Sequence, residues 1–375
     1  MTIAAHIAVN KHSAPSFLFE CLTRLALQYP GNHFILFIDK ADKGAAIAPD
    51  NCTWVLISPK IKNSLLLHYW YNYKLPYLLK RYNAGVFISE NAVLSIRTNK
   101  AQMMVLKDLI PVKKMILKAD KNARYLRKFF PFFLKKATTI FTSEKYIEAT
   151  TAARYPFTKN KILSVYPGIN KNYQPISWQQ KEEITAAYAD EKDYFLYPVS
   201  SNTKNNIINA LKAFSQFKKW QKSNMLLLLM VQDKTLLSAA SGDGLVKDFG
   251  LYKYRNEVKI ITQTDDKENA KIIAGAYALL YLPADERIEY PCLNAMQCEV
   301  PVITTATNLN KSMYGEAVIY CTTDEKTIAQ KMMLVYKDEN LRNDCIKNGL
   351  LQTARYSWDS STQLMWQAII KISEQ

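Results

Sequence analysis

Short apolar runs alternate with amphipathic stretches along this chain, and the alternation predicts its secondary structure. The apolar runs, such as residues 33–39 and 225–231, have the length and composition of buried β-strands. The stretches between them, such as residues 16–30, place apolar side chains at helical spacing. Strands that alternate with helices indicate parallel sheets, because each helix carries the chain back across the sheet.

The alternation occurs twice, which indicates two domains. Residues 162–175 separate the two series and form a strand and a proline-containing loop, where we place the linker. We therefore predict an α/β fold of two Rossmann-like, doubly wound parallel-sheet domains, residues 1–172 and 173–359, that face a central cleft. A last helix over residues 360–375 is predicted to cross back to the first domain. The predicted strands are residues 3–9, 33–39, 52–58, 84–89, 102–106, 138–143, 193–200, 225–231, 257–262, 278–283, 300–305 and 317–321.

The composition is that of a globular protein and excludes several kinds of site. The 375 residues are 49% hydrophobic and 22% charged. Only 10 glycines occur and none precedes Gly31, which excludes a P-loop or a G-x-G-x-x-G dinucleotide motif after the first strand. The six cysteines show no C-x-x-C spacing, and all four histidines lie in the first fifth of the chain. We therefore expect reduced thiols and no metal site.

The chain shows no targeting or membrane-spanning segment by sequence. Its first residues resemble a buried strand rather than a signal peptide. The longest strongly apolar run, residues 225–231, is far shorter than the ~20 residues of a membrane span. We therefore expect a cytoplasmic protein.

Charge is the most informative bulk property, because it is unevenly distributed. Residues 1–175 hold 26 basic and 9 acidic side chains, a net charge of +17, whereas residues 176–375 have a net charge of −1. Residues 60–136 alone hold 17 basic and 3 acidic side chains. We therefore expect the first domain to contact an anionic partner.

Residues 121–136 mix basic and aromatic side chains, and two interpretations are open. In one, this helix lies on an anionic membrane surface, at the inner face of the membrane. In the other, it is an ordinary amphipathic helix whose aromatic side chains enter the core. Pro131 is expected to break the helix in both. The mixture also suits single-stranded nucleic acid, but no nucleic-acid fold signature accompanies it, so we expect no nucleic-acid partner.

Four sequence motifs occur in a characteristic order. Residues 165–170 (VYPGIN) are similar to the linker motif VYPGID, and Lys204 begins a segment similar to RKN…L..AF. Residues 280–305 match the pattern YPSxYEGFGLPxLEAMACGxPVI without gaps, and residues 314–358 end in a similar helical tail and Tyr-Ser-Trp. Together these motifs resemble glycosyltransferase family 4, whose members have two Rossmann-like domains in the GT-B arrangement.

The resemblance implies roles in the third motif, which normally carries two glutamates eight positions apart. The first, Glu286 here, contacts the transferred sugar in the family; the alternative is a solvated loop carboxylate. The second, which holds the nucleotide ribose, is Asn294 here, and its amide can still bond a ribose hydroxyl. The alternative for Asn294 is a helix N-cap. In the family, two glycines of this motif let the backbone approach the donor diphosphate; in this chain they are replaced by Arg287 and Glu289. Arg287 is a candidate phosphate partner. Glu289 repels phosphate if its side chain points toward the donor.

Other donor contacts are also altered relative to the family. The usual Gly-Arg pair after the first strand of the second domain is Ser200-Ser201 here. Lys204 and Asn205 remain as candidate phosphate contacts, although a lysine at a helix start is often only solvated. The backbone near Thr262 and Thr264 is expected to contact the nucleotide.

The first domain offers two candidates for the chemistry on the acceptor side. Lys107 stands where the family usually has a histidine before Asp-Leu, and it is a candidate catalytic group that holds a donor hydroxyl or phosphate. His12 follows the first predicted strand and is a candidate acceptor contact; the alternative is a surface histidine.

The resemblance implies an enzyme, a hexosyltransferase-type glycosyltransferase of polysaccharide biosynthesis. It would move a sugar from a UDP- or GDP-sugar to a glycan or lipid-linked glycan acceptor, with retention and with no metal or other cofactor. One alternative is a catalytically degenerate, non-catalytic partner in a glycan-assembly complex, since Asn294, Ser200-Ser201 and the lost glycines weaken the donor site. A further alternative is another enzyme on the same fold, such as a sugar-nucleotide epimerase.

Overall fold

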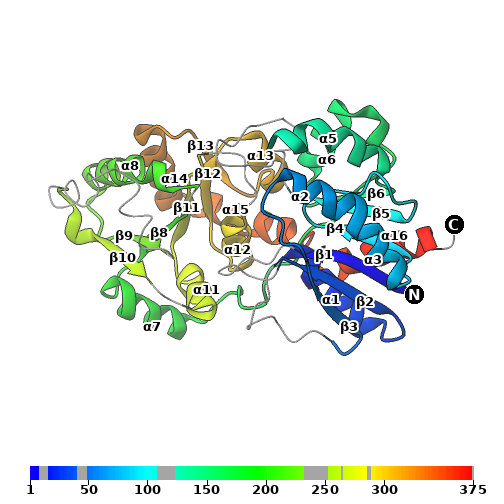
Figure 1. Ribbon diagram of the computed structural model, residues 1–375. Coiled ribbons are helices and arrows are strands. Elements are labelled where there is room, and N and C mark those ends of the chain that lie inside the picture. Colours follow the sequence, from blue (N-terminus) through cyan, green and yellow to red (C-terminus); the bar gives the residue numbers. More distant parts are fainter. Residues whose placement is uncertain are drawn as a thin grey trace. The chain divides into compact units, whose positions relative to one another are not determined.

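The computed structural model describes residues 1–7, 16–39, 49–107, 123–200, 202–231, 252–262, 265–284 and 289–373. The chain divides into two compact units (Figure 1). The first is Met1–Gly168 together with Ser357–Gln375, and the second is Ile169–Tyr356. Each unit is built on one parallel sheet covered by helices, so the predicted fold class of two Rossmann-like α/β domains is confirmed.

The first sheet has seven strands in the order β3-β2-β1-β4-β5-β6-β7, and every neighbouring pair is parallel. The chain order reverses between β1 and β4, which makes this pair the topological switch point, where ligands of open α/β sheets bind. The strands are β1 (Thr2–Ile7), β2 (His33–Ile38), β3 (Cys52–Leu56), β4 (Val86–Ser89), β5 (Ala101–Leu106), β6 (Thr139–Thr142) and β7 (Ile162–Ser164).

Helices cover both faces of the first sheet. Helix α1 (Phe17–Gln28) begins at Ser16, whose hydroxyl accepts a hydrogen bond from the N–H of Phe19 at 3.2 Å and caps the helix. The opposite face carries the continuous run α2 (Ser64–Tyr69), η1 (Trp70–Lys74) and α3 (Leu75–Arg81), in which η1 is a π-helical turn. The other helices in the described part of this unit are α5 (Ala123–Lys136), α6 (Lys145–Arg154), η2 (Pro156–Thr158) and α16 (Trp358–Ser373).

Pro131 does not break α5, contrary to the prediction. The helix runs through this proline from Ala123 to Lys136. Proline removes one backbone hydrogen bond, but the adjacent Phe130 and the nearby Phe133 are buried in the core. Burial of the two rings offsets the lost bond. Most of the aromatic side chains described in this helix therefore pack inside the unit, whereas Phe132 remains 53% exposed.

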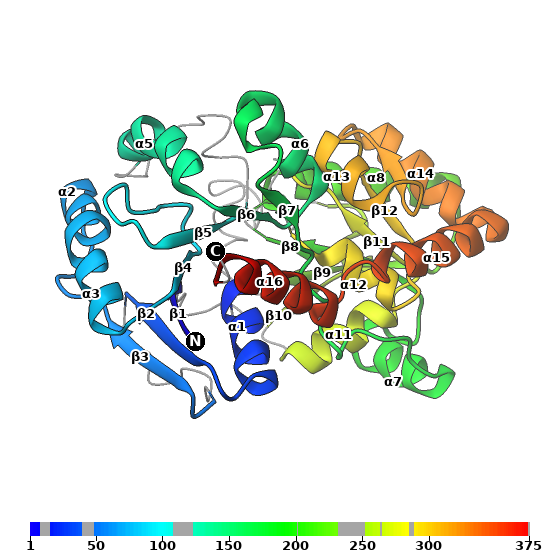
Figure 2. The same ribbon diagram turned by 90° about the vertical axis from the view of Figure 1, so that its right-hand side faces the viewer.

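The C-terminal helix α16 returns to the first unit, as predicted, and lies beside α1 (Figure 2). Met365 and Ile369 are fully buried in the core that α16 shares with α1. The rings of Trp366 and Tyr29 stack with their centroids 4.0 Å apart. Helix α16 thus forms part of the hydrophobic core of the first unit.

The second sheet has six parallel strands in the order β10-β9-β8-β11-β12-β13, so its switch point lies between β8 and β11. Helices α8 and α14 lie side by side over one face (Figure 1). The strands are β8 (Tyr194–Val199), β9 (Leu226–Val231), β10 (Val258–Thr262), β11 (Ala278–Tyr281), β12 (Val302–Thr305) and β13 (Ile319–Cys321). The helices are α7 (Trp178–Ala189), η3 (Lys204–Asn206), α8 (Ile207–Trp220), η4 (Arg255–Glu257), α11 (Asp266–Ala274), α12 (Pro291–Gln297), α13 (Asn308–Tyr314), α14 (Glu325–Lys337) and α15 (Glu339–Thr353).

No helix in the described part of the chain is long and apolar enough to cross a membrane.

Candidate functional site

The switch point of the second sheet is formed by the turn after β8 and by the end of β11. The turn begins at Ser200 and continues into η3. Hydrogen bonds tie it to the segment that follows β11: the Asn206 side-chain amide donates to the carbonyl of Leu282 at 2.9 Å, and the N–H of Ala284 donates to the carbonyl of Asn202 at 2.8 Å and to its Oδ1 at 3.2 Å. This edge is therefore the candidate donor site.

Several backbone N–H groups in the described part of the turn are already used within it. The N–H of Ser200 donates to Oγ1 of Thr203 at 2.8 Å, and the N–H of Asn202 donates to Oγ of Ser200 at 3.1 Å. The N–H of Lys204 donates to the carbonyl of Ser200 at 3.0 Å. Phosphate-binding loops instead present such groups to the anion. The N–H groups of Ser200, Asn202 and Lys204 are therefore not presented to a phosphate, which leaves the side chain of Lys204 as the candidate contact.

The carboxylate of Glu289 points into the same turn. Its Oε2 accepts a hydrogen bond from the Tyr281 hydroxyl at 2.7 Å and from Oγ of Ser200 at 3.1 Å. Tyr281 is 2% exposed, and burial, together with the charge of Glu289, raises the pKa of its hydroxyl far above the usual range. Tyr281 therefore stays a proton donor. The Glu289 carboxylate thus points toward the turn after β8. This is the orientation in which it is predicted to repel a phosphate bound there.

Lys204 and Asn205 differ from their neighbour Asn206. Lys204 begins η3 and is partly buried, and no described carboxylate lies within ion-pair distance of its ammonium group. Asn205 is exposed, whereas Asn206 is buried and holds Leu282. Asn206 thus has a structural role that Asn205 lacks. The sequence could not distinguish the two residues, because the difference depends on which of them faces the segment after β11.

Asn294 lies inside α12 rather than at its start. The N-cap residue of α12 is Tyr290, and the N–H of Asn294 donates to the Tyr290 carbonyl at 2.9 Å in the first helical turn. The N-cap interpretation of Asn294 is therefore wrong. Its side chain is half-buried and has no hydrogen-bond partner among the residues that the structure describes. The amide is therefore available to a ligand.

Of the remaining predicted residues of the donor and acceptor sites, the structure describes one and leaves four outside the described residues. Thr262 ends β10, whose last residue pairs with the last residue of β9, so it reaches the carboxyl-end edge of the sheet. Thr264, Glu286 and Arg287 lie outside the described residues, and so does His12 of the first unit.

The switch point of the first sheet holds an ion pair that includes Lys107. Its Nζ lies 2.5 Å from Oε1 of Glu90. Glu90 follows β4 and its side chain is fully buried, whereas Lys107 follows β5 and its side chain is 41% exposed. Because the buried carboxylate holds the ammonium in one orientation, Lys107 presents a fixed, half-exposed cation at this edge.

Sequence reasoning missed His6, which is buried in β1 at the same switch point. Its Nδ1 lies 2.5 Å from the hydroxyl of Tyr71 in η1, and its Nε2 lies 3.5 Å from Oδ2 of Asp39, which follows β2. A histidine within an apolar strand was the available signal, because a buried polar side chain needs partners. His6 therefore links the ends of two strands to the helical layer.

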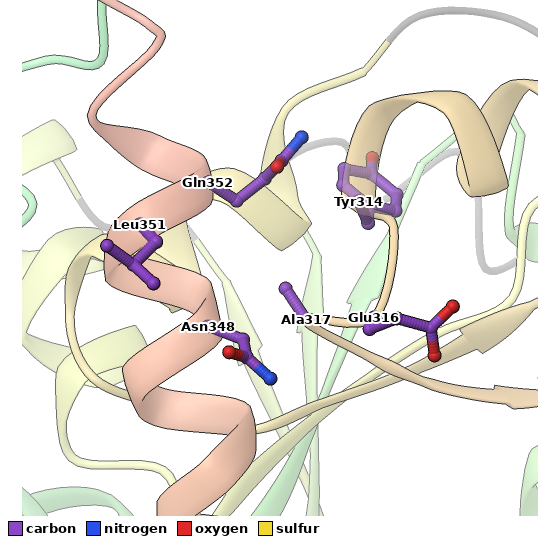
Figure 3. A pocket seen from close by; sticks show the side chains of 6 residues that line it. All are labelled: Tyr314, Glu316, Ala317, Asn348, Leu351 and Gln352. Carbon is purple, nitrogen blue, oxygen red and sulfur yellow. The ribbon is translucent and has the colours of Figure 1, made fainter.

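A small pocket in the second unit lies apart from these residues (Figure 3). It has a volume of about 240 Å³ and lies between the turn that follows α13 and helix α15. The side-chain amide of Gln352 donates to the carbonyl of Met313. None of the predicted site residues lines this pocket, so we do not assign the donor to it. Its lining residues are Tyr314, Glu316, Ala317, Asn348, Leu351 and Gln352.

The cysteines are unsuited to nucleophilic chemistry. All six are free thiols. Burial raises the pKa of Cys21 and Cys292 to about 12 and that of the partly buried Cys52 to about 11. Since only the thiolate reacts, we expect the native thiols at pH 8 to react with DTNB at least ~100-fold more slowly than those of the urea-unfolded protein. Rapid reaction of one thiol in the native protein would contradict this assignment.

The chain resembles a known protein family and a known enzyme in sequence. Residues 179–352 match the family model described as Glycosyl transferases group 1. The O-antigen chain mannosyltransferase RfbU of Salmonella typhimurium is 23% identical over 241 residues, which is 64% of this chain. The matched region spans 62% of that relative's length.

Solved structures resemble the whole chain. Sucrose-phosphate synthase from Thermosynechococcus elongatus aligns with a TM-score of 0.74 and 17% identity over 99% of this chain and 98% of its own. HepE from Anabaena, in complex with UDP and glucose, aligns with a TM-score of 0.73 and 11% identity over 99% and 100%. At these identities the likeness establishes the shared fold alone.

Proposed function

We propose that the protein is a glycosyltransferase, because residues 179–352, most of its second unit, match the family model of the group 1 glycosyl transferases. It moves a sugar from a nucleotide-sugar donor, a UDP- or GDP-sugar, to a glycan or lipid-linked glycan acceptor. The observation that carries this proposal is that the family match covers the unit whose switch point holds Lys204, a lysine with no ion-pair partner among the described residues. The complex of HepE with UDP and glucose supports the donor class, and the O-antigen mannosyltransferase supports a glycan acceptor.

The proposed reaction is retaining and requires no metal or other cofactor. The bond between the anomeric carbon and the donor phosphate breaks, and a bond to the acceptor oxygen forms on the same face of the sugar. The departing phosphate takes the proton of the acceptor hydroxyl. Lys204 stabilises the charge that develops on this phosphate. The side-chain amide of Asn294 donates a hydrogen bond to the ribose. Lys107, in the first unit, holds a hydroxyl or phosphate group of the donor.

Thermal unfolding of the full-length protein with UDP, GDP, ADP and their sugar conjugates tests the proposal. A ligand present at 100 times its dissociation constant adds about 2.7 kcal/mol to the free energy of unfolding. A raised midpoint with one nucleotide family supports the donor assignment and identifies the base. No shift with any of them at millimolar concentration would contradict it.

A second candidate is a non-catalytic partner in a glycan-assembly complex. The observation that favours it is the inward carboxylate of Glu289, next to a turn whose described N–H groups are already bonded. The variant Asn294→Glu separates the candidates. A large gain in turnover would indicate decayed catalysis, whereas loss of an existing activity would indicate a site adapted to asparagine.

We further propose that the first unit contacts an anionic membrane surface at the inner face of the membrane. In the described parts of residues 60–136 the only carboxylate belongs to Glu90, which is buried, so the exposed charge there is entirely positive. Leu65, Tyr69, Tyr73 and Tyr77 follow one another at four-residue intervals along α2, η1 and α3. They are 80%, 45%, 48% and 57% exposed.

Cations border this aromatic row. The guanidinium of Arg97 lies 4.2 Å from the ring centroid of Tyr73, and the ammonium of Lys74 lies 5.7 Å from that of Tyr77. Helix α5 adjoins the row, since Nδ1 of His68 lies 3.2 Å from the hydroxyl of Tyr125. Tyrosine rings beside basic side chains are typical of surfaces that lie at the headgroup level of anionic membranes.

The triple variant with Tyr69, Tyr73 and Tyr77 changed to serine is expected to bind anionic vesicles of phosphatidylglycerol and phosphatidylcholine about 10-fold more weakly in a sedimentation assay. The rings lose their contact with the interface, while the basic charge is unchanged. Trp220→Ser, which removes a 48% exposed ring from α8 of the second unit, is the matched control and should leave binding unchanged. Equal binding by wild type and triple variant would contradict this surface.

A further inference from the structure

The carboxylate of Glu289 has no role in the proposed reaction, yet it is fixed at the switch point of the second sheet. The Tyr281 hydroxyl at 2.7 Å and Oγ of Ser200 at 3.1 Å both donate to the same oxygen, Oε2. The Tyr314 hydroxyl donates to the Glu289 backbone carbonyl at 3.4 Å. Glu289 is thus bonded to the turn after β8, to β11 and to α13, and its charge is held in place.

The described charges at this edge nearly cancel. Within residues 200, 202–206, 281–284 and 289–290, Lys204 and Glu289 are the two charged side chains. The N–H groups of Ser200, Asn202 and Lys204 are bonded within the turn and add no uncompensated positive dipole. Lys204 and Glu289 both contact Ser200, the first through its backbone N–H and the second through its carboxylate, so a diphosphate bound at this turn lies near both residues.

We propose that Glu289 is a specificity-determining residue of the donor site, whose carboxylate opposes the phosphate groups of the donor. This inference rests on the proposed function. It means that the nucleoside and the sugar supply most of the donor affinity, and that the diphosphate is bound weakly. Two like charges a few ångströms apart at a partly buried site repel strongly enough to change affinity by at least ~10-fold.

The variant Glu289→Gln isolates the charge. Glutamine has the same length, and its amide oxygen can accept both hydroxyl hydrogen bonds, so the links to β11 and to the turn are kept. Titration calorimetry on the full-length chain should show UDP or GDP binding ~10-fold more tightly to this variant than to wild type. Affinity for the corresponding nucleoside, uridine or guanosine, should not change. The gain for the diphosphate should shrink in ~1 M salt, where the Debye length is about 3 Å.

Two further variants complete the test. Glu183→Gln, on the exposed face of α7 in the same unit, makes the same change in net charge and should leave diphosphate affinity unchanged. Tyr281→Phe removes one of the two hydroxyls that hold the carboxylate and should give a smaller gain, of ~2–3-fold. It provides an independent measurement if Glu289→Gln does not fold.

The outcomes separate this inference from the proposed function. Equal or weaker diphosphate binding by Glu289→Gln, in a protein whose wild type binds nucleotide, would overturn the inference and leave the donor assignment standing. Parallel loss of nucleoside affinity would show that Glu289 holds the ligand, which also overturns it. If neither wild type nor variant binds any of these nucleotides at millimolar concentration, both the donor site and the inference are wrong.

Discussion

Replacing Gly168 with alanine is expected to lower the melting temperature by roughly 6–12 °C, corresponding to about 3 kcal/mol of lost stability. A Cβ at this position would lie 2.2 Å from a ring carbon of Trp358 and 2.6 Å from the Trp358 backbone nitrogen. The ring can move, but the backbone nitrogen begins α16, whose Met365 and Ile369 are buried in the core of the first unit. Alanine therefore displaces the whole helix rather than one side chain. Differential scanning calorimetry measures the effect.

Gly31→Ala is the matched control for this prediction. Gly31 lies in the turn between α1 and β2, and no atom lies within 4 Å of a Cβ built on it. The same substitution there should change the melting temperature by no more than ~2 °C. If both glycine variants melt at the wild-type temperature, the contact between Gly168 and Trp358 does not fix α16.

Changing Lys204 to methionine is expected to lower kcat/KM for glycosyl transfer by about 100-fold. The reason is electrostatic, since the described N–H groups of the turn are bonded within it and Lys204 is the one described cation of this edge. Methionine keeps the aliphatic length and removes the charge that would stabilise the departing phosphate. Steady-state kinetics with the donor identified by thermal unfolding provides the measurement.

Lys212→Met, on the exposed face of α8, is the control for general charge loss. It should retain wild-type kcat/KM. Since we propose that Lys204 and Glu289 act on the same phosphate with opposite sign, adding Glu289→Gln to Lys204→Met should restore part of the lost affinity. A Lys204→Met enzyme with full activity would exclude this lysine from the donor site.

The predicted strands and the prediction of two α/β domains rested on patterns that extend over many residues. Buried parallel strands, such as β9 with its run of leucines, require apolar side chains on both faces, so they can be predicted from a continuous apolar run in the sequence. Pro131 shows the limit of local rules. Its cost to α5 is fixed by its chemistry, but whether the helix survives depends on the burial of Phe130 and Phe133, which the local sequence does not encode.

The candidate site was predictable in part. Motif spacing predicted Lys204 and Asn294 as site residues, and the structure places Lys204 in η3 after β8 and Asn294 in α12 after β11. The orientation of Glu289 was not predictable. It depends on Tyr281 and Ser200, which are 8 and 89 positions away in the chain. His6 was missed for the same reason, because its partner Tyr71 is 65 positions away.

By itself, then, the sequence determined which segments are strands and helices, where the charge is concentrated and which family motifs are present, because these properties follow from residue type and spacing along the chain. Only the tertiary structure decided which polar side chains meet. It paired Lys107 with Glu90, placed the Glu289 carboxylate beside Ser200, and left Lys204 without a described ion-pair partner. The physical reason is that hydrogen bonds and ion pairs act over a few ångströms in space, whereas the groups they join can lie far apart in sequence, as Glu289 and Ser200 do at 89 positions.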